Sequence, residues 1–209
     1  QLRRAAGSAL EDVLRDFAGV QLSRTGGPGQ AAGIFIRGAS MANTVVLIDG
    51  VRIGSATLGQ AALEALGLAA IERIEVLRGP GSSLYGADAV GGVVQVFTRR
   101  GQRGAPHAQA SLHAGRYGSS EAQGSVSGVV GDFDLALSAS REASDGVSAV
   151  ANPADAFGRY NPDADGFSRG SVSAQLGYAI TPSQRIGLRL LDTRLRSQYD
   201  SAESAPPDF

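Results

Sequence analysis

The second half of the chain alternates between large apolar residues and small or polar ones, and no other feature constrains the fold as strongly. The alternation is clear in residues 133–140, 172–180 and 186–190, and weaker in residues 107–117 and 121–130. A period of two places successive side chains on opposite faces of a strand. The second half is therefore predicted to be antiparallel β-sheet.

Turn signals divide this alternation into strands. Gly131-Asp132 and Thr181-Pro182-Ser183 are predicted to be tight turns, whereas residues 143–168 are rich in Asp, Asn, Gly and Pro and are predicted to be a long loop. Short turns that alternate with long loops are typical of an outer-membrane barrel. The alternation by itself also fits a soluble antiparallel sandwich or barrel.

The first half mixes short helices with short strands. Residues 8–19 are predicted to be a helix, because Ser8 and Glu11 have capping-box spacing and Gly19 suits its end. Its apolar stripe consists of Leu10, Val13, Leu14 and Phe17. Residues 59–69, rich in Ala and Leu, are predicted to be a second helix. Strands are predicted over residues 34–37, 44–48, 71–77 and 93–98, with a hairpin turn at Asp49-Gly50.

Composition excludes several classes of protein. The chain has no cysteine, which excludes disulfides, thiol nucleophiles and Cys-ligated zinc. Its net charge of -1 gives no electrostatic basis for binding nucleic acid. It has no lysine for a P-loop, and its two histidines, His107 and His113, lie on a predicted strand without a nucleophile motif. The sequence therefore carries no enzyme signature.

Three blocks of the first half carry a specific family resemblance. The stretch from Ala70 to Thr98, preceded by Ile34–Gly38 and Val45–Arg52, resembles the plug domain of TonB-dependent outer-membrane receptors in both order and spacing. The periodicity changes near residues 99–104. The resemblance implies an α+β plug domain over residues 1–104, followed by antiparallel transmembrane β-barrel strands over residues 105–209.

The resemblance also implies an incomplete barrel and an active transporter of the bacterial outer membrane. We expect the chain to be a fragment that lacks a signal peptide, the TonB-contacting segment and most of the barrel. TonB would be the periplasmic energy-coupling partner, and outer-membrane lipid would surround the strands. Charged plug residues near strand ends, such as Asp49, are expected to meet barrel charges in a polar interface.

Acidic loops suggest a cation site. Asp163 and Asp165 are followed by Gly166, and such spacing supplies two oxygen ligands on one turn, although the spacing alone favours a solvated acidic loop. The loops resemble the calcium loops of the cobalamin-receptor branch of the family. The resemblance implies a two-ion calcium site with these ligands: Asn161, Asp163, Asp165, Tyr199, Asp200 and Asp208. A further ligand from the earlier part of the same loop is either Asp145 or Ser148.

The same branch suggests where the ligand binds. Plug apical loops contact the corrinoid in that branch, and the matching positions here are Ala31, Gly33, Ser40, Leu58 and Gly59. Cobalamin is therefore the expected ligand, and a ferric-siderophore or haem receptor of the same family is the alternative. Two further alternatives are an outer-membrane signal receptor with an additional N-terminal domain, and a soluble β-rich ligand-binding domain.

Overall fold

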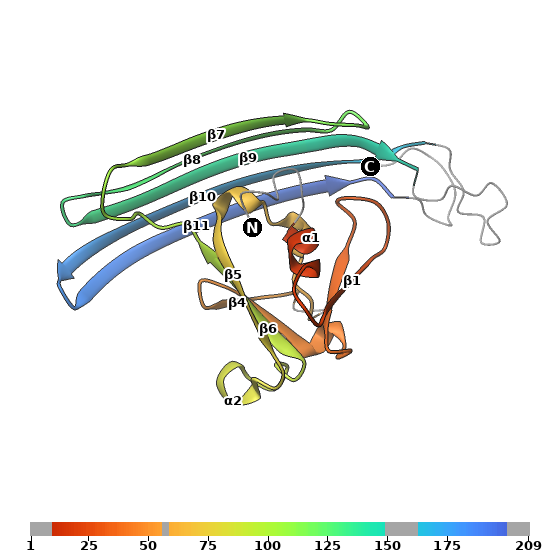
Figure 1. The fold of residues 1–209 in the computed structure, drawn as a ribbon, viewed down its shortest axis with the longest axis horizontal. Coiled ribbons are helices and arrows are strands. Elements are labelled where there is room, and N and C mark those ends of the chain that lie inside the picture. The colour runs from red at the N-terminus through yellow and green to blue at the C-terminus, as the bar shows by residue number, and fades with distance from the viewer. Residues whose placement is uncertain (1–9, 56–58, 149–162, 200–209) are drawn as a thin grey trace.

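A computed structural model describes residues 10–55, 59–148 and 163–199 of the chain. Within these residues, a five-stranded sheet of long strands curves over a smaller unit that mixes short helices and strands (Figure 1). Residues 99–106 connect the smaller unit to the sheet. We refer to the two parts as the N-terminal unit and the curved sheet.

The N-terminal unit contains two small sheets. Strands β1 (Val20–Arg24) and β2 (Ala32–Ile36) form an antiparallel pair, and four other strands form a sheet in the order β4-β3-β6-β5. Those strands are β3 (Thr44–Ile48), β4 (Val51–Ile53), β5 (Ile71–Arg78) and β6 (Gly92–Thr98). The helical elements are α1 (Leu10–Arg15), α2 (Ser82–Tyr85) and the 3₁₀ turns η2 (Met41–Asn43), η3 (Leu63–Ala65) and η4 (Leu68–Ala70).

Apolar side chains of this unit form two buried clusters, and the larger one contains helix α1. Leu10 and Leu14 of α1 are completely buried, and they pack in a cluster with side chains of β2, β3, β6 and η3. Leu191 of the curved sheet packs against the same cluster. The core of the N-terminal unit therefore extends to the inner face of the sheet, which fixes how the two parts meet.

The predicted hairpin turn is confirmed and has a further role. Asp49 and Gly50 both have positive φ angles, 50° and 86°, as expected for the turn between β3 and β4. The Asp49 carboxylate accepts a hydrogen bond from the backbone N–H of Thr98 over 3.1 Å. The turn thus ties β3 to the end of β6, next to the connection to the curved sheet.

The curved sheet consists of five antiparallel strands in the order β11-β10-β9-β8-β7. They are β7 (His107–Ala114), β8 (Ser120–Val130), β9 (Phe133–Val147), β10 (Asp165–Thr181) and β11 (Gln184–Ser197). The two-residue turns after β8 and β10 lie at one end, and the longer connection between β9 and β10 lies at the other. Among the described residues the sheet is open, as expected for a segment of the barrel wall that the family resemblance implies.

The two faces of this sheet have opposite polarity. The inner face buries small or polar side chains, including Asp134, Ser138 and Gln175. The outer face exposes large apolar ones, such as Leu135 at 41% and Leu188 at 71%. This distribution is inverted relative to a water-soluble sheet and matches a sheet whose outer face contacts lipid. In the described part of the chain, no helix is long and apolar enough to cross a membrane.

Three sequence-based boundaries were wrong. The first helix ends at Arg15 and not at residue 19, since residues 16–19 turn toward β1, whereas its predicted start at Ser8 lies outside the described residues. Residues 59–69 do not form a helix but contain the 3₁₀ turns η3 and η4, the second of which extends to Ala70. The loop predicted over residues 143–168 is shorter, because β9 continues to Val147 and β10 begins at Asp165.

The segment between η3 and η4 fails to become a helix because it lies directly against the barrel wall. Gly67 is buried, and a Cβ atom built there would be 2.9 Å from Oγ of Ser140 and 3.2 Å from Cβ of Ser171. Both serines belong to the inner face of the curved sheet. A helical segment with side chains on all sides would not fit this contact, whereas a glycine and short turns do.

We expect Gly67→Ala to weaken the contact between the N-terminal unit and the curved sheet by about 1–3 kcal/mol, because the added methyl overpacks it. The measurement is the urea midpoint for separation of the two parts in the full-length protein. Gly27→Ala is the matched control, since a Cβ there has nothing within 4 Å. Adding Ser140→Ala should restore part of the loss, and simple additivity of the two changes would contradict the proposed clash.

Candidate functional site

The loop between β1 and β2 contacts the ends of β10 and β11 at the long-connection end of the sheet. The Gln30 side-chain amide donates a hydrogen bond to the backbone carbonyl of Gln198. Gly29 lies against Phe167, where a Cβ atom would come within 2.7 Å of the phenylalanine side chain. The loop over residues 25–31 is therefore held at the rim of the curved sheet.

Gln198 also joins β11 to β10. Its backbone N–H donates to the carbonyl of Gly166 over 2.9 Å, and its side-chain oxygen accepts from the Gly166 N–H over 3.0 Å. The backbone of β10 and β11 is thus fixed directly beside the segments that carry the predicted calcium ligands. One glutamine connects those segments to the loop that carries Ala31, a predicted ligand contact.

The predicted ligand contacts occupy different environments. Ala31, Ser40 and Gly59 are exposed, whereas Gly33 is buried beneath Met41. A small cavity of about 20 Å³ separates this part of β2 from Gln60, which follows Gly59. Leu58 lies outside the described residues. Exposure of three of the five positions leaves them accessible to a ligand, and their role stays a prediction.

The predicted calcium ligands are only partly described. Asp163 is half-buried, Asp165 is 3% exposed at the first position of β10, and Tyr199 is 65% exposed. Asn161, Asp200 and Asp208 lie outside the described residues. Within residues 10–55, 59–148 and 163–199, no group of three or more His, Cys, Asp or Glu side chains is arranged to hold a metal ion. Calcium binding therefore stays a prediction.

Arg169 of β10 fastens the N-terminal unit to the wall. It is 5% exposed, forms an ion pair with Glu142 of β9, and donates a hydrogen bond of 2.7 Å to the backbone carbonyl of Glu64. The Glu64 carboxylate in turn accepts a 3.4 Å hydrogen bond from the Ala32 N–H. Sequence reasoning missed this arginine, because an isolated charge on an alternating strand is indistinguishable from a solvated one.

A second buried charge lies close to Arg169. Glu11 of α1 is completely buried, and Arg24 forms ion pairs with it over 3.2 Å and with Asp12 over 2.8 Å. Burial raises the pKa of Glu11, while a backbone hydrogen bond and the charges of Arg24 and Arg169 oppose that rise. Helix α1 is therefore held to β1 by a carboxylate whose ionisation is penalised.

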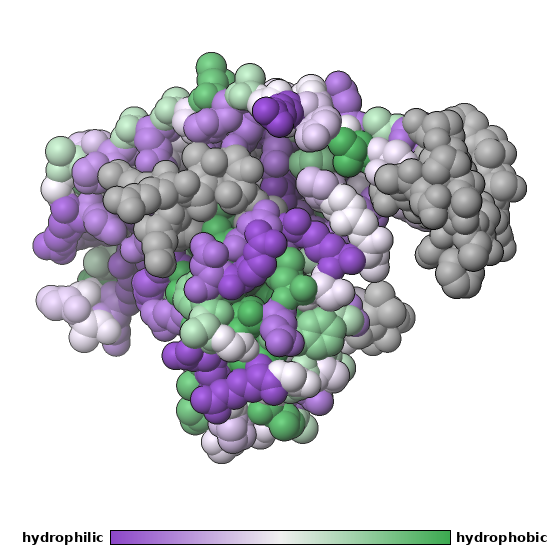
Figure 2. Space-filling view, turned by 45° about the vertical axis from the view of Figure 1, so that its right-hand side comes forward, coloured by the Kyte–Doolittle hydropathy of each residue, from purple (hydrophilic) through white to green (hydrophobic). Residues whose placement is uncertain are grey.

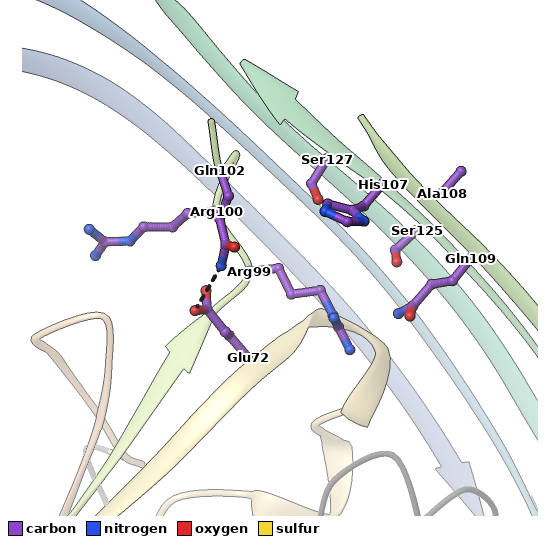
Figure 3. A pocket seen from close by; sticks show the side chains of 9 residues that line it. All are labelled: Glu72, Arg99, Arg100, Gln102, His107, Ala108, Gln109, Ser125 and Ser127. Carbon is purple, nitrogen blue, oxygen red and sulfur yellow. Dashed lines mark hydrogen bonds between the residues drawn. The ribbon is translucent and has the colours of Figure 1, made fainter. Parts of the chain in front are cut away.

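Polar contacts also connect the opposite end of the N-terminal unit to the sheet. Arg189 of β11 lies 3.7 Å from the Asp49 carboxylate, as expected for a charge that meets the wall. A crevice of about 290 Å³ separates Glu72, Arg99, Arg100 and Gln102 from His107, Gln109, Ser125 and Ser127 of the wall (Figure 3). Hydrophilic side chains gather where the unit lies beneath the sheet (Figure 2). Polar side chains thus line the junction at both ends of the N-terminal unit.

Comparisons with known proteins identify this arrangement. Residues 1–93 match the family model described as TonB-dependent Receptor Plug Domain. The chain belongs to the TonB-dependent receptors, a family of outer-membrane proteins that are receptors and transporters and not enzymes. The N-terminal unit is therefore the plug, and the curved sheet is part of the barrel wall.

Two relatives of this chain are vitamin B12 transporters. The chain is 36% identical over 199 residues to the vitamin B12 transporter BtuB of Photobacterium profundum, across 95% of this chain and 32% of that protein. It is 42% identical over 150 residues to the vitamin B12 transporter BtuB of Vibrio vulnificus, across 70% and 24%. The chain thus spans about a third or less of the length of these relatives.

Solved structures support the same fold. The ferric enterobactin receptor PfeA of Pseudomonas aeruginosa, in complex with enterobactin, matches with a TM-score of 0.76 and 22% identity, across 95% of this chain and 33% of that one. The siderophore receptor PirA of Acinetobacter baumannii matches with a TM-score of 0.72 and 24% identity, across 92% and 30%. At these identities the likeness establishes the fold alone.

We expect Arg169→Met to loosen the plug from the wall by about 3–5 kcal/mol, because Glu142 would remain partly buried without its cation. The measurement is hydrogen exchange of residues 63–70 in the full-length protein, which should accelerate. Arg103→Gln, an exposed arginine in the connection, serves as the control. Unchanged protection at residues 63–70 in Arg169→Met would show that this side chain does not hold the plug.

Glu11 should make helix α1 sensitive to pH. A raised folded-state pKa means that the stabilising contribution is complete below the unfolded pKa and is lost as pH rises through the folded pKa. Hydrogen-exchange protection of residues 10–15, corrected for intrinsic rates, should therefore fall across that window. Glu11→Gln should remove the step and the exposed Asp16→Asn should keep it; a step that persists in Glu11→Gln would assign it to another group.

Proposed function

We propose that the protein containing this chain is a TonB-dependent active transporter of the outer membrane and that its ligand is cobalamin. The plug and the barrel strands would bind the ligand on the outer side, at the end of the sheet where the long connections lie. TonB would then act on the plug from the periplasm and open a path. No covalent bond of the ligand changes in this process.

The observation that carries the proposal is the extent of the similarity to the vitamin B12 transporters. It covers 95% of this chain at 36% identity, so it includes both the plug and the barrel strands. Ligand contacts in such a design come from both parts. Similarity restricted to the plug would support only the assignment to TonB-dependent transporters. Similarity that extends to the barrel strands also supports the identity of the ligand.

The geometry of the rim is consistent with a ligand-responsive junction. Gln198 connects the β10 and β11 ends to Gln30 of the plug, between the predicted calcium loops and the predicted ligand contacts. We infer that calcium would order the acidic loops through Asp163 and Asp165, and that a ligand bound above Ala31 would contact these loops. Hard oxygen ligands of this kind suit calcium.

The test is binding of labelled cobalamin to cells that express the full-length protein, with and without chelation of calcium. We expect tight binding that weakens on chelation. The variant Asp163→Asn/Asp165→Asn should weaken binding at least about tenfold and should abolish the effect of chelation, because it removes two anionic ligands of similar shape.

Asp132→Asn is the matched control, since Asp132 is an exposed acid in a short turn at the opposite end of the barrel. It should leave binding unchanged. Absence of cobalamin binding in protein located in the outer membrane would overturn the cobalamin assignment and favour a ferric-siderophore or haem ligand. Binding that ignores both chelation and the double variant would retain cobalamin and overturn the calcium site.

A further inference from the structure

The outer face of the sheet carries an apolar band with an aromatic lower rim. Phe133 of β9 and Tyr178 of β10 are cross-strand neighbours, with ring centroids 4.7 Å apart. From this pair toward the long connections, the outward positions are apolar up to Ala139 on β9 and Val172 on β10. Such a band marks the hydrocarbon layer of the membrane.

Directly above the band, two arginines lie in one cross-strand row. Gly170 of β10 is paired with Arg141 of β9 on one side and with Arg194 of β11 on the other. Residues that are directly opposite in antiparallel strands project from the same face. Arg141 is exposed and the Arg194 side chain is 86% exposed, so both point outward.

The row has the shape of a shallow site. Two inter-strand spacings separate the arginine backbones by about 10 Å. Gly170 between them has no side chain, and a Cβ atom there would meet nothing within 4 Å. Two residue pairs further along, on the same face, Ser168 lies opposite another exposed arginine, Arg196. The surface at Gly170 is therefore unobstructed between the side chains of Arg141 and Arg194, and the hydroxyl of Ser168 lies at its edge.

The site carries excess positive charge. Among the described residues, its three arginines, Arg141, Arg194 and Arg196, are accompanied on the same face by one acid, Asp192, which lies 3.4 Å from Arg194. That pair is exposed on both sides, at 86% and 57%, so it contributes little and remains open to competition by a stronger anion. Guanidinium groups bind phosphate oxygens in a bidentate manner and are the preferred side chain for that purpose.

The height of the row matches the outer boundary of the hydrocarbon layer. Arg141 lies eight residues after Phe133, and Arg194 lies eight residues after Ile186. Strands that rise ~3.3 Å per residue and tilt ~40° cover about 20 Å of membrane depth over that length. The row lies toward the longer connections, which face the cell exterior in barrels of this kind.

We propose that Arg141, Gly170 and Arg194, with Ser168 and Arg196, bind the phosphate-bearing headgroup of an outer-leaflet lipid. The acyl chains of that lipid would cover the apolar band directly below, which explains why the cationic row and the band are continuous. A free anion would gain nothing from the band, and a soluble protein would not reach this depth. The proposal concerns the outer wall, so it is independent of the transported ligand.

The test uses the full-length protein, stripped of lipid in neutral detergent and then mixed with diphosphoryl or monophosphoryl lipid A. Native mass spectrometry measures how much lipid each variant retains. We expect the wild type to prefer the diphosphoryl form, and Arg141→Gln/Arg194→Gln to bind it at least about tenfold more weakly, since two charge-assisted contacts are lost.

Arg103→Gln, an exposed arginine away from the row, should bind lipid A as the wild type does. Heat-modifiable mobility on gels checks that each variant contains a folded barrel. Equal retention by the double variant and the wild type would overturn the proposal. Displacement of lipid A by millimolar inorganic phosphate would also overturn it, because the site would then recognise a free anion and not a lipid.

Discussion

The close approach of residues 63–70 to the barrel wall is the contact on which the arrangement of the two parts depends. Gly67 lies against Ser140 and Ser171, and Leu191 of the wall joins the plug core. Small inward-facing residues on β9 and β10 make this approach sterically feasible. The inward positions of β9 and β10 are mostly small or polar, so the plug is held there by shape, by a few polar contacts and by the packing of Leu191 against its core.

Polar contacts at this junction combine specificity with limited strength. A hydrogen bond that replaces a bond to water contributes about 0.5–1.5 kcal/mol to stability. A buried charge that loses its partner costs about 3–5 kcal/mol. Arg169 belongs to the second class because it is 5% exposed and paired with Glu142. Arg189 is different, because its side chain is 39% exposed and can exchange its 3.7 Å contact with the Asp49 carboxylate for water. Under the proposed function the plug rearranges during transport, and this mixture of contacts suits such a step better than an apolar interface would.

Particular elements show how far the sequence predicts this structure. The turn at Asp49-Gly50 and strands β3, β5 and β6 were predicted within one or two residues, because their signals are local: a turn dipeptide and runs of β-branched residues. Residues 59–69 were predicted to be helical from their Ala and Leu content, and the prediction was wrong. The contact of Gly67 with the wall determines the conformation of that segment. Local helix propensity contains no information about a contact with residues that lie more than 70 positions away in the sequence.

By itself, the sequence determined the two kinds of structure, the tight turns and the family. These features follow from the period of the apolar pattern and from short motifs, and both can be recognised within a few residues of sequence. The tertiary structure alone decided that Arg169 is buried while Arg141 and Arg194 are exposed, and that Gln30 reaches Gln198. On alternating strands an arginine has the same appearance in sequence whichever face it occupies. Register and curvature assign the face, and the face determines whether the charge holds the plug or meets the membrane.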